Sequence, residues 1–296
     1  MKDKIINIAI LIACVLVWGT SFLLIKKGLA VFTFDEVAAI RVGVAFIATL
    51  PILLYNFRKI PRETWKFLLM VGLMGNGIPA LLFPFAQQHI ESHLAGVLNS
   101  LTPVFVLILG VLLFKQKNDP RKYIGIGLGF VGAVMLMQFT AHPTASDGMV
   151  IDNRYAWFCV LATVCYGIST NTIKSYLQDV DATHAMAGSL LFVGLPFLIY
   201  LFSCTDVVHT VQTNPEAWKA VGYLTILAVM STVVASILYI VLLQRTTAVF
   251  GSTTTYIMPI VSLAWGWMDG ESLQPIVFLC LALILVGVWL TAKSKG

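Results

Sequence analysis

Long apolar runs alternate with short polar connections along the whole chain. A helix needs about 20 apolar residues to cross the hydrocarbon core of a bilayer, and runs of that length recur throughout. The longest polar connection, residues 140–153, is too short to hold a soluble catalytic domain. The pattern predicts an all-α integral membrane protein with ten transmembrane helices. We expect these helices near residues 5–26, 35–57, 65–87, 92–114, 121–139, 154–176, 183–203, 217–242, 247–268 and 273–292.

The composition agrees with a bilayer environment and gives the helices a direction. The chain is 58% apolar and 11% charged, whereas soluble domains carry about 25% charged residues. Its net charge of +5 does not indicate nucleic acid, because 14 of the 19 Lys and Arg residues fall on one side of the predicted membrane, together with both termini. Cytoplasmic loops are enriched in Lys and Arg. We therefore expect a multi-pass protein of a bacterial inner membrane, with both termini in the cytoplasm and with lipid and a small-molecule substrate as its partners.

The motifs of enzymes and metal sites are missing from the sequence. It has no Walker loop, nucleophile elbow, HExxH helix or dinucleotide fingerprint. None of the five cysteines has metal-ligand spacing, and no disulfide pattern is suggested. The segment HIESH (His89, Glu91, His93) superficially offers metal ligands, but no fourth ligand is evident, and we interpret it as a solvated turn. The sequence thus predicts no enzyme, no cofactor and no metal.

The two halves of the chain contain the same landmarks in the same order. WGTS at 18–21 corresponds to YGIS at 166–169, and a lysine, Lys26 or Lys174, follows eight residues after each aromatic. Further matches at a constant offset of 156 are Gln88 with Gln244, Pro103 with Pro259, and Gly110 with Gly266.

The matches divide the chain into a first five-helix repeat (1–139), an outer connecting loop (140–153) and a second five-helix repeat (154–296). Because five is odd, the second half enters the membrane from the opposite side, which makes the pair an inverted repeat. Such repeats are typical of alternating-access carriers, whose binding site lies near the membrane midplane between the repeats.

Four segments taken together resemble the EamA-type transporters of the drug/metabolite transporter superfamily. They are WGTSF in the first helix, AAIRVGVAF around Arg41, LNSLTPVFVLILG at 98–110 and TTYIMPIVSLAWGWMDGE at 254–271. The resemblance covers essentially the whole chain. It implies two inverted five-helix repeats around a central cavity lined by helices 1–4 and 6–9, with helices 5 and 10 as peripheral packing or homodimer contacts. It also implies export of amino acids or other small metabolites. One departure is that Lys115 and Lys117 stand where the second half has Asp269 and Glu271.

Polar side chains inside the predicted spans are the candidate site residues, because such groups are costly in hydrocarbon. Trp18, Ser21 and Lys26 share one stripe of the first helix, which faces either a cavity or a packed neighbour; Lys26 and Lys174 can also simply reach the headgroups. Arg41 lies about 9 Å inside helix 2. Its guanidinium requires either an acidic partner (Asp35, Glu36 or Glu271) or substrate, and both alternatives remain open.

Asn76 lies in GLMGNGIPALLFP, where glycines and prolines loosen helix 3 and favour a water-filled cavity. Similar reasoning selects polar groups near the matching prolines and turns of the other helices. The candidate substrate-binding residues are Trp18, Ser21, Arg41, Asn76, Asn99, Tyr166, Asn171, Tyr239 and Tyr256, and the candidate gating or coupling residues are Lys26, Lys174 and Glu271.

These observations predict a secondary carrier that exports small metabolites, with amino acids as the first candidate substrates. No Asp or Glu lies in the middle of a predicted span, so proton coupling is either absent or uses a residue at a mouth, such as Glu271. The alternatives are a multidrug exporter, a lipid scramblase and a membrane-embedded lipid-modifying enzyme. The first alternative suits the aromatic-rich composition, but a cation site ordinarily requires a buried carboxylate.

Overall fold

The computed structural model describes residues 2–115, 122–139, 152–252, 254–271 and 273–293, and all regular structure in these ranges is helical. The first half contains α1 (Lys2–Leu29), α2 (Phe34–Asn56), α3 (Trp65–Val71), α4 (Ile78–Gln87), α5 (Ser92–Asn99), α6 (Thr102–Leu112) and α7 (Lys122–Phe139). The second half contains α8 (Ala156–Tyr176), α9 (Ala182–Cys204), α10 (Val207–Thr213), α11 (Ala217–Ile226), α12 (Ser236–Arg245), α13 (Ala248–Ser252), α14 (Thr254–Met268) and α15 (Pro275–Lys293). Three short 3₁₀ turns, η1 (Phe57–Lys59), η2 (Arg62–Thr64) and η4 (Asn153–Tyr155), and two π-helical segments, η3 (Gly72–Gly77) and η5 (Leu227–Ala235), complete the set.

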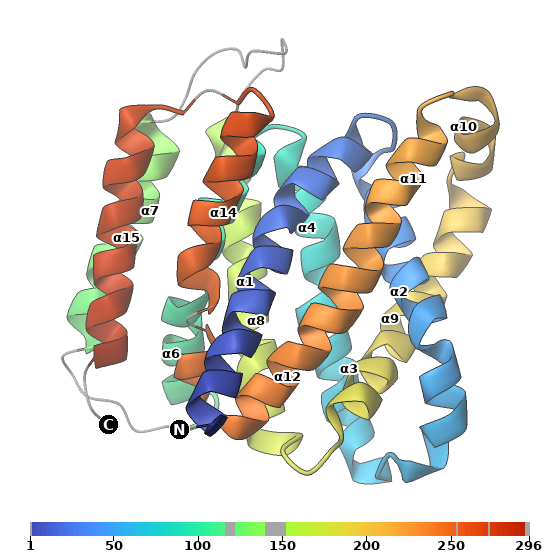
Figure 1. Cartoon of the computed structure of the whole chain (residues 1–296), viewed down its shortest axis with the longest axis horizontal. Helices are drawn as coiled ribbons and strands as arrows, with labels where there is room; N and C mark the ends of the chain where they lie inside the picture. The colour runs from blue at the N-terminus through green and yellow to red at the C-terminus, as the bar shows by residue number, and fades with distance from the viewer. Residues whose placement is uncertain (1, 116–121, 140–151, 253, 272, 294–296) are drawn as a thin grey trace.

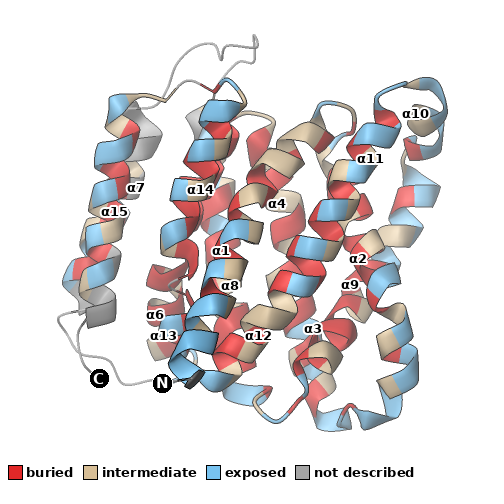
Figure 2. Cartoon of the chain, in the orientation of Figure 1, coloured by how far each residue is buried: buried red, intermediate tan, exposed pale blue. Residues whose placement is uncertain are grey.

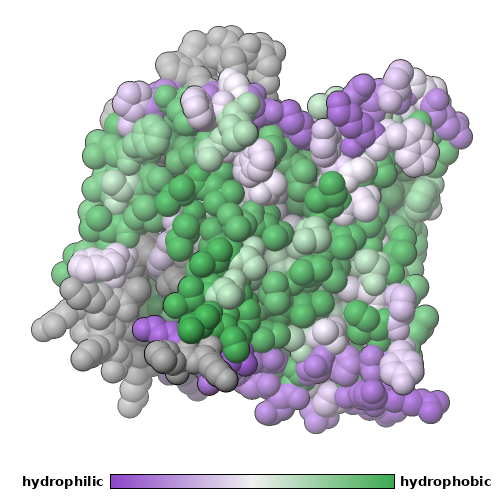
Figure 3. Space-filling model, in the orientation of Figure 1, coloured by the Kyte–Doolittle hydropathy of each residue, from purple (hydrophilic) through white to green (hydrophobic). Residues whose placement is uncertain are grey.

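Eight helices, or runs of consecutive helices, in the described part of the chain are long and apolar enough to cross a membrane. They cover Asp3–Leu29, Phe34–Lys59, Arg62–Gln87, Ser92–Leu112, Ala156–Tyr176, Ala182–Cys204, Ala217–Arg245 and Ala248–Met268. On the face drawn in Figure 3, an apolar belt lies between two polar rims, and buried residues alternate with exposed ones along the helices in Figure 2. The prediction of an all-helical membrane protein is confirmed. The remaining two expected positions are occupied by α7 and α15, and a total of ten spans remains a prediction.

Helix α1 begins and α15 ends at the same end of the bundle (Figure 1). We call this the terminal end, where α1 begins and α15 ends, and we call the opposite end, where α1 ends and α5 begins, the far end. Helices of the first half pack mainly against helices of the second, with α1 against α14, α2 against α9 and α6 against α8. The space between the halves is therefore bounded by both.

Helices α7 and α15 pack against each other at one side of the bundle (Figure 1). A Cβ atom added at Gly287 would lie 2.5 Å from both the Gly125 oxygen and the Gly129 nitrogen, so only glycine allows this approach. The glycine-rich face of α7 is thus used within the chain, to bind α15.

Two transmembrane runs are widened in the middle by π-helical turns. Segment η3 contains Gly75 and Gly77 and is followed by Pro79, which lacks an amide hydrogen for the helical ladder. Segment η5 corresponds to η3 in the sequence repeat, at the offset of 156 residues. Unlike η3, it contains neither glycine nor proline. π-Helical turns are frequent at functional sites, and here they place Asn76 and Ser231 at the central cavity.

Candidate functional site

A cavity of about 880 Å³, its mouth included, lies between helices of the two halves. Seven of the nine candidate substrate-binding residues line the cavity: Trp18, Ser21, Arg41, Asn76, Asn99, Tyr166 and Tyr239.

Polar contacts in the cavity wall join α1 to η5. The Trp18 indole Nε1 donates to the backbone carbonyl oxygen of Ser231 (3.1 Å). The Ser21 hydroxyl donates to the side-chain hydroxyl of Ser231 (2.8 Å). On another face of the same turn, a Cβ atom at Gly19 would lie 2.5 Å from the Val261 Cβ of α14. The WGTSF turn therefore lines the cavity and packs against a neighbouring helix.

Arg41 is the only charged residue in the cavity wall among the described residues. Its Nε donates to the Thr232 hydroxyl (2.9 Å), and the Tyr166 phenol interacts with the same guanidinium. Neither partner is negatively charged, so the charge of Arg41 is uncompensated within the described cavity.

The acids that were candidates to pair with Arg41 have other partners in the structure. Asp35 accepts a hydrogen bond from the Tyr200 hydroxyl (2.6 Å), and Glu36 accepts one from the backbone amide of Thr33 (3.0 Å). Glu271 lies in a separate ion-paired group described below. Of the two alternatives for Arg41, the ion pair is not formed in the part of the chain that the structure describes.

Aromatic rings form the apolar walls of the cavity. The Trp18 and Tyr239 rings meet edge to face, with centroids 5.1 Å apart. Toward the far end, the Phe83 ring contacts both Phe22 (5.6 Å) and Tyr166 (6.0 Å). These rings offer flat apolar surfaces on either side of the polar groups.

Two asparagines contribute amides to the wall. Asn99 donates to the Met258 sulfur (3.7 Å), and its Oδ1 accepts from the Thr102 hydroxyl (3.4 Å). Asn76 has no side-chain hydrogen bond to any described residue and faces the cavity. Its amide is therefore available for a ligand.

Asn171 and Tyr256, the other two candidates, are not among the lining residues. Asn171 is fully buried and donates to the carbonyl oxygens of Val106 (2.8 Å) and Gly167 (2.9 Å), which ties α8 to α6. Tyr256 is half-buried, and it is the adjacent Thr255 that lines the cavity. Neither side chain is thus placed in the cavity wall: Asn171 ties two helices together, and Tyr256 packs against the apolar core.

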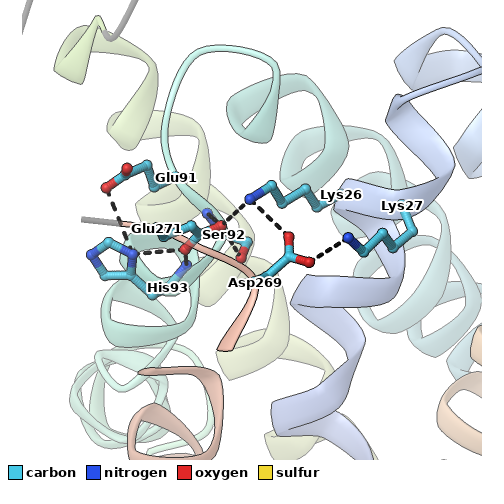
Figure 4. A network of polar contacts seen from close by, with 7 residues as sticks. All are labelled: Lys26, Lys27, Glu91, Ser92, His93, Asp269 and Glu271. Atoms are coloured by element: carbon cyan, nitrogen blue, oxygen red, sulfur yellow. Dashed lines mark hydrogen bonds and ion pairs between the residues drawn. The ribbon is translucent and has the colours of Figure 1, made fainter. Parts of the chain in front are cut away.

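An acid–base cluster lies at the far end of the bundle and joins the two halves (Figure 4). We define it as Lys26, Lys27, Ser92, His93, Asp269 and Glu271. Lys26 Nζ lies 3.0 Å from both Glu271 Oε1 and Asp269 Oδ2, and Lys27 pairs with Asp269. Lys26 thus binds two acids rather than extending alone toward the headgroups.

The Glu271 carboxylate binds the N-terminus of α5. It accepts the backbone amides of Ser92 and His93 (both 3.1 Å), the Ser92 hydroxyl (2.6 Å) and His93 Nδ1 (2.8 Å). A helix N-terminus carries partial positive charge and free amide hydrogens, so an anion is stable there. This contact buries the HIESH segment and corrects our interpretation of it as a solvated turn.

The cluster keeps both of its acids ionised. Burial opposes ionisation of Glu271, but hydrogen bonds from His93 and Ser92 and the charges of His93 and Lys26 outweigh it and hold the Glu271 pKa well below its usual range. Burial likewise opposes ionisation of Asp269, while Lys27 and Lys26 lower its pKa. No group of three or more potential metal ligands occurs among the described residues.

Lys174 lies at the terminal end, where it binds helix carbonyls. Its Nζ donates to the carbonyl oxygens of Leu243 (3.0 Å) and Thr246 (2.6 Å), at the C-terminus of α12. In return, Gln244 of α12 donates to the carbonyl oxygens of Leu177 (3.0 Å) and Val180 (2.7 Å), after the end of α8. Each side chain thus binds carbonyl oxygens at or just beyond a helix C-terminus, where the helical ladder ends.

Several lining residues were not predicted from the sequence. All of them carry small hydroxyl side chains, and all but Thr102 belong to the second half of the chain: Thr102, Ser169, Thr170, Ser231, Ser236 and Thr255. One signal was present, since Ser231 and Thr232 interrupt an apolar run at the offset of 156 from the Asn76 region.

The fold defines a multi-pass α-helical membrane protein with a central cavity between its two halves. The model of the EamA-like transporter family matches residues 5–138 and 153–293, and the chain belongs to this family of membrane transporters.

Individual relatives agree with this assignment. The uncharacterized inner membrane transporter YedA of Escherichia coli (strain K12) is 25% identical over 291 residues, covering 96% of this chain and 90% of YedA. The uncharacterized transporter YoaV of Bacillus subtilis (strain 168) is 23% identical over 290 residues, covering 95% of this chain and 94% of YoaV. A protein of known crystal structure matches with a TM-score of 0.64 and 15% identity over 96% of this chain and 95% of that one, which shows likeness of fold alone.

Proposed function

We propose that this transporter exports small amphipathic metabolites that carry a carboxylate, with amino acids as the first candidates. The observation that supports this proposal is Arg41, a cation in a cavity whose described walls contain no acid. A guanidinium binds a carboxylate through paired hydrogen bonds. A substrate carboxylate would supply the negative charge that no described residue of the cavity wall provides for Arg41.

The rest of the cavity suits the other parts of an amino acid. Its apolar side chain can lie against the rings of Trp18, Tyr166 and Tyr239, and its ammonium group can donate to the amide oxygens of Asn76 and Asn99. This combination of an apolar wall with a few convergent polar groups is usual for small-molecule sites. It specifies the head group closely and the side chain loosely.

Multidrug export remains the second candidate because the walls are aromatic. Flat lipophilic cations stack well on such rings. However, a bound cation would share the cavity with the positive charge of Arg41 and would find no acid in the described wall. A carboxylate substrate is favoured on this ground.

The transport cycle we propose is alternating access between two inverted five-helix repeats, 1–139 and 154–296. Support comes from the two separate ranges that the family model matches and from the π-helical segments at equivalent places in the two halves. The acid–base cluster would hold the far end closed, and breaking Lys26 from Glu271 would open it. Lys174 and Gln244 would have to release their carbonyls when the terminal end rearranges.

We also propose an inner-membrane location with both termini in the cytoplasm, so that the far end faces outward. The proposal rests on the excess of Lys and Arg on the terminal side of the predicted membrane and on the inner-membrane name of the relative YedA. The peripheral α7–α15 pair would contact lipid or a second copy of the chain.

Efflux from reconstituted vesicles tests the proposed function. Vesicles loaded with labelled leucine, phenylalanine, a lipophilic cation or a fluorescent phospholipid would be compared with and without a pH gradient. We expect release of the amino acids and retention of the cation and the lipid. Release of the cation alone would support multidrug export, and lipid movement alone would support a scramblase.

A further inference from the structure

Gln87, the last residue of α4, has a buried amide with no partner. Gln87 is only 5% exposed, and neither its Nε2 nor its Oε1 atom has a hydrogen bond in the described structure. An unpaired amide in a buried position is costly, and nearly all such groups in proteins are satisfied. The position therefore calls for a partner that this conformation does not provide.

Gln87 lies one helical turn beyond the cavity, at about the level of the acid–base cluster along the bundle. Phe83, four residues earlier on α4, lines the cavity, and four residues of helix rise about 6 Å toward the far end. On α1, the same step leads from Phe22 in the cavity wall to Lys26 in the cluster. The Phe22 and Phe83 rings are in contact, so the two helices are adjacent at this level.

The equivalent position in the second half shows that packing does not require glutamine here. At the offset of 156, Gln87 corresponds to Leu243, which is fully buried and belongs to an apolar core cluster. A leucine thus fills this helical position in the other half. This comparison favours a role for the Gln87 amide other than packing.

We propose that Gln87 is part of a second substrate subsite, which forms on the exit side of the cavity when the acid–base cluster opens. A neutral amide donates to a carboxylate and accepts from an ammonium group, so it would bind both ends of the amino-acid head group. Because the amide is uncharged, it holds the carboxylate less strongly than Arg41 does, which favours release. This inference rests on the proposed function and adds a second binding site along the same transport path.

Cysteine accessibility tests the subsite. Gln87→Cys would be placed in a Cys204→Ser background, since Cys204 is the one exposed cysteine among the described residues, and an impermeant thiol reagent would be added at the far end. We expect slow labelling when the cluster is intact. When Glu271→Gln breaks the cluster, labelling should be about tenfold faster, and an excess of leucine and phenylalanine should suppress it by a similar factor.

Two controls keep the result interpretable. Leu243→Cys, the matched position in the other half, should remain unlabelled from the far end in the same background. Absence of faster labelling at position 87, or labelling that the amino acids do not suppress, would overturn the subsite. Export by the wild-type protein in parallel vesicles separates failure of the subsite from failure of the proposed function.

Transport by Gln87→Leu gives an independent test. Because leucine occupies the equivalent buried position, we expect this variant to reach normal membrane abundance. Its export of leucine and phenylalanine should fall about tenfold, the effect of losing one buried polar contact. Export at the wild-type rate would overturn the proposal.

Discussion

Lys26 and Glu271, 245 positions apart in the sequence, form a 3.0 Å ion pair that joins the two halves of the bundle at the far end. Glu271 reaches further to the N-terminus of α5, so three separate segments meet at one carboxylate. This geometry suits a gate better than a proton carrier, because the surrounding cations and amides keep Glu271 ionised.

Removing the charge of Glu271 should destabilise the folded protein. Glu271→Gln leaves Lys26 with Asp269 alone and weakens the hold on α5, and since Lys26 is partly exposed we expect a loss of about 1–3 kcal/mol. Thermal unfolding in detergent measures it. Asp152→Asn, which breaks an exposed ion pair with Arg154, is the matched control and should change the melting temperature little. Equal melting of both variants would show that the cluster does not hold the bundle.

The same carboxylate predicts a loss of stability in acid. The pKa of Glu271 is lower in the folded chain than its ordinary value of 4.5, so its contribution is complete above pH 4.5 and disappears as the pH falls toward the folded-state pKa. Melting temperatures between pH 7 and pH 3 should therefore fall more for the wild type than for Glu271→Gln. Parallel curves would contradict the assignment.

Two asparagines should give opposite results when changed to alanine. Asn76→Ala removes a free amide from the cavity, so transport should fall roughly 5- to 150-fold, the equivalent of about 1–3 kcal/mol, at normal abundance. Asn171→Ala leaves the buried Val106 carbonyl oxygen without this donor, so abundance and melting temperature should fall. Transport per folded molecule and thermal unfolding separate the two effects. The same pattern for both variants would mean that Asn76 also serves packing.

Orientation in the membrane follows from the basic residues at the terminal end. With Cys204 replaced by serine, Arg62→Cys should resist an impermeant thiol reagent in intact cells, and Gln212→Cys should react. Both positions are exposed and lie at opposite ends of the bundle. The reverse pattern would show that the far end faces the cytoplasm.

The positions of most helices, and Arg41 as a charged residue within a span, could be predicted from the sequence, but whether Arg41 meets an acid or the cavity was left open. Apolar runs specify spans directly, and a polar residue within such a run stands out because it is costly there. The pairing of Glu271 with Ser92 and His93 could not be predicted in this way, since it depends on how a loop docks onto a helix N-terminus 178 or more residues away.

The second π-helical segment also lacked a direct sequence signal. Segment η3 follows from its glycines, whereas η5 consists of helix-compatible residues and widens only in its packed setting. Asn171 was predicted to line the cavity because it is a polar residue within a span, like Asn76 and Asn99. It instead donates to backbone carbonyl oxygens of α6 and of its own helix, away from the cavity.

Counterflow of an amino acid and its methyl ester tests the central claim, that Arg41 binds a substrate carboxylate. The ester keeps the side chain and the amino group but removes the negative charge. Wild-type vesicles should exchange phenylalanine at least about tenfold faster than its methyl ester, and Arg41→Gln should abolish this preference, whereas Arg154→Gln at an exposed site should preserve it. Equal exchange of acid and ester by the wild type, or a preference that survives Arg41→Gln, would contradict the account.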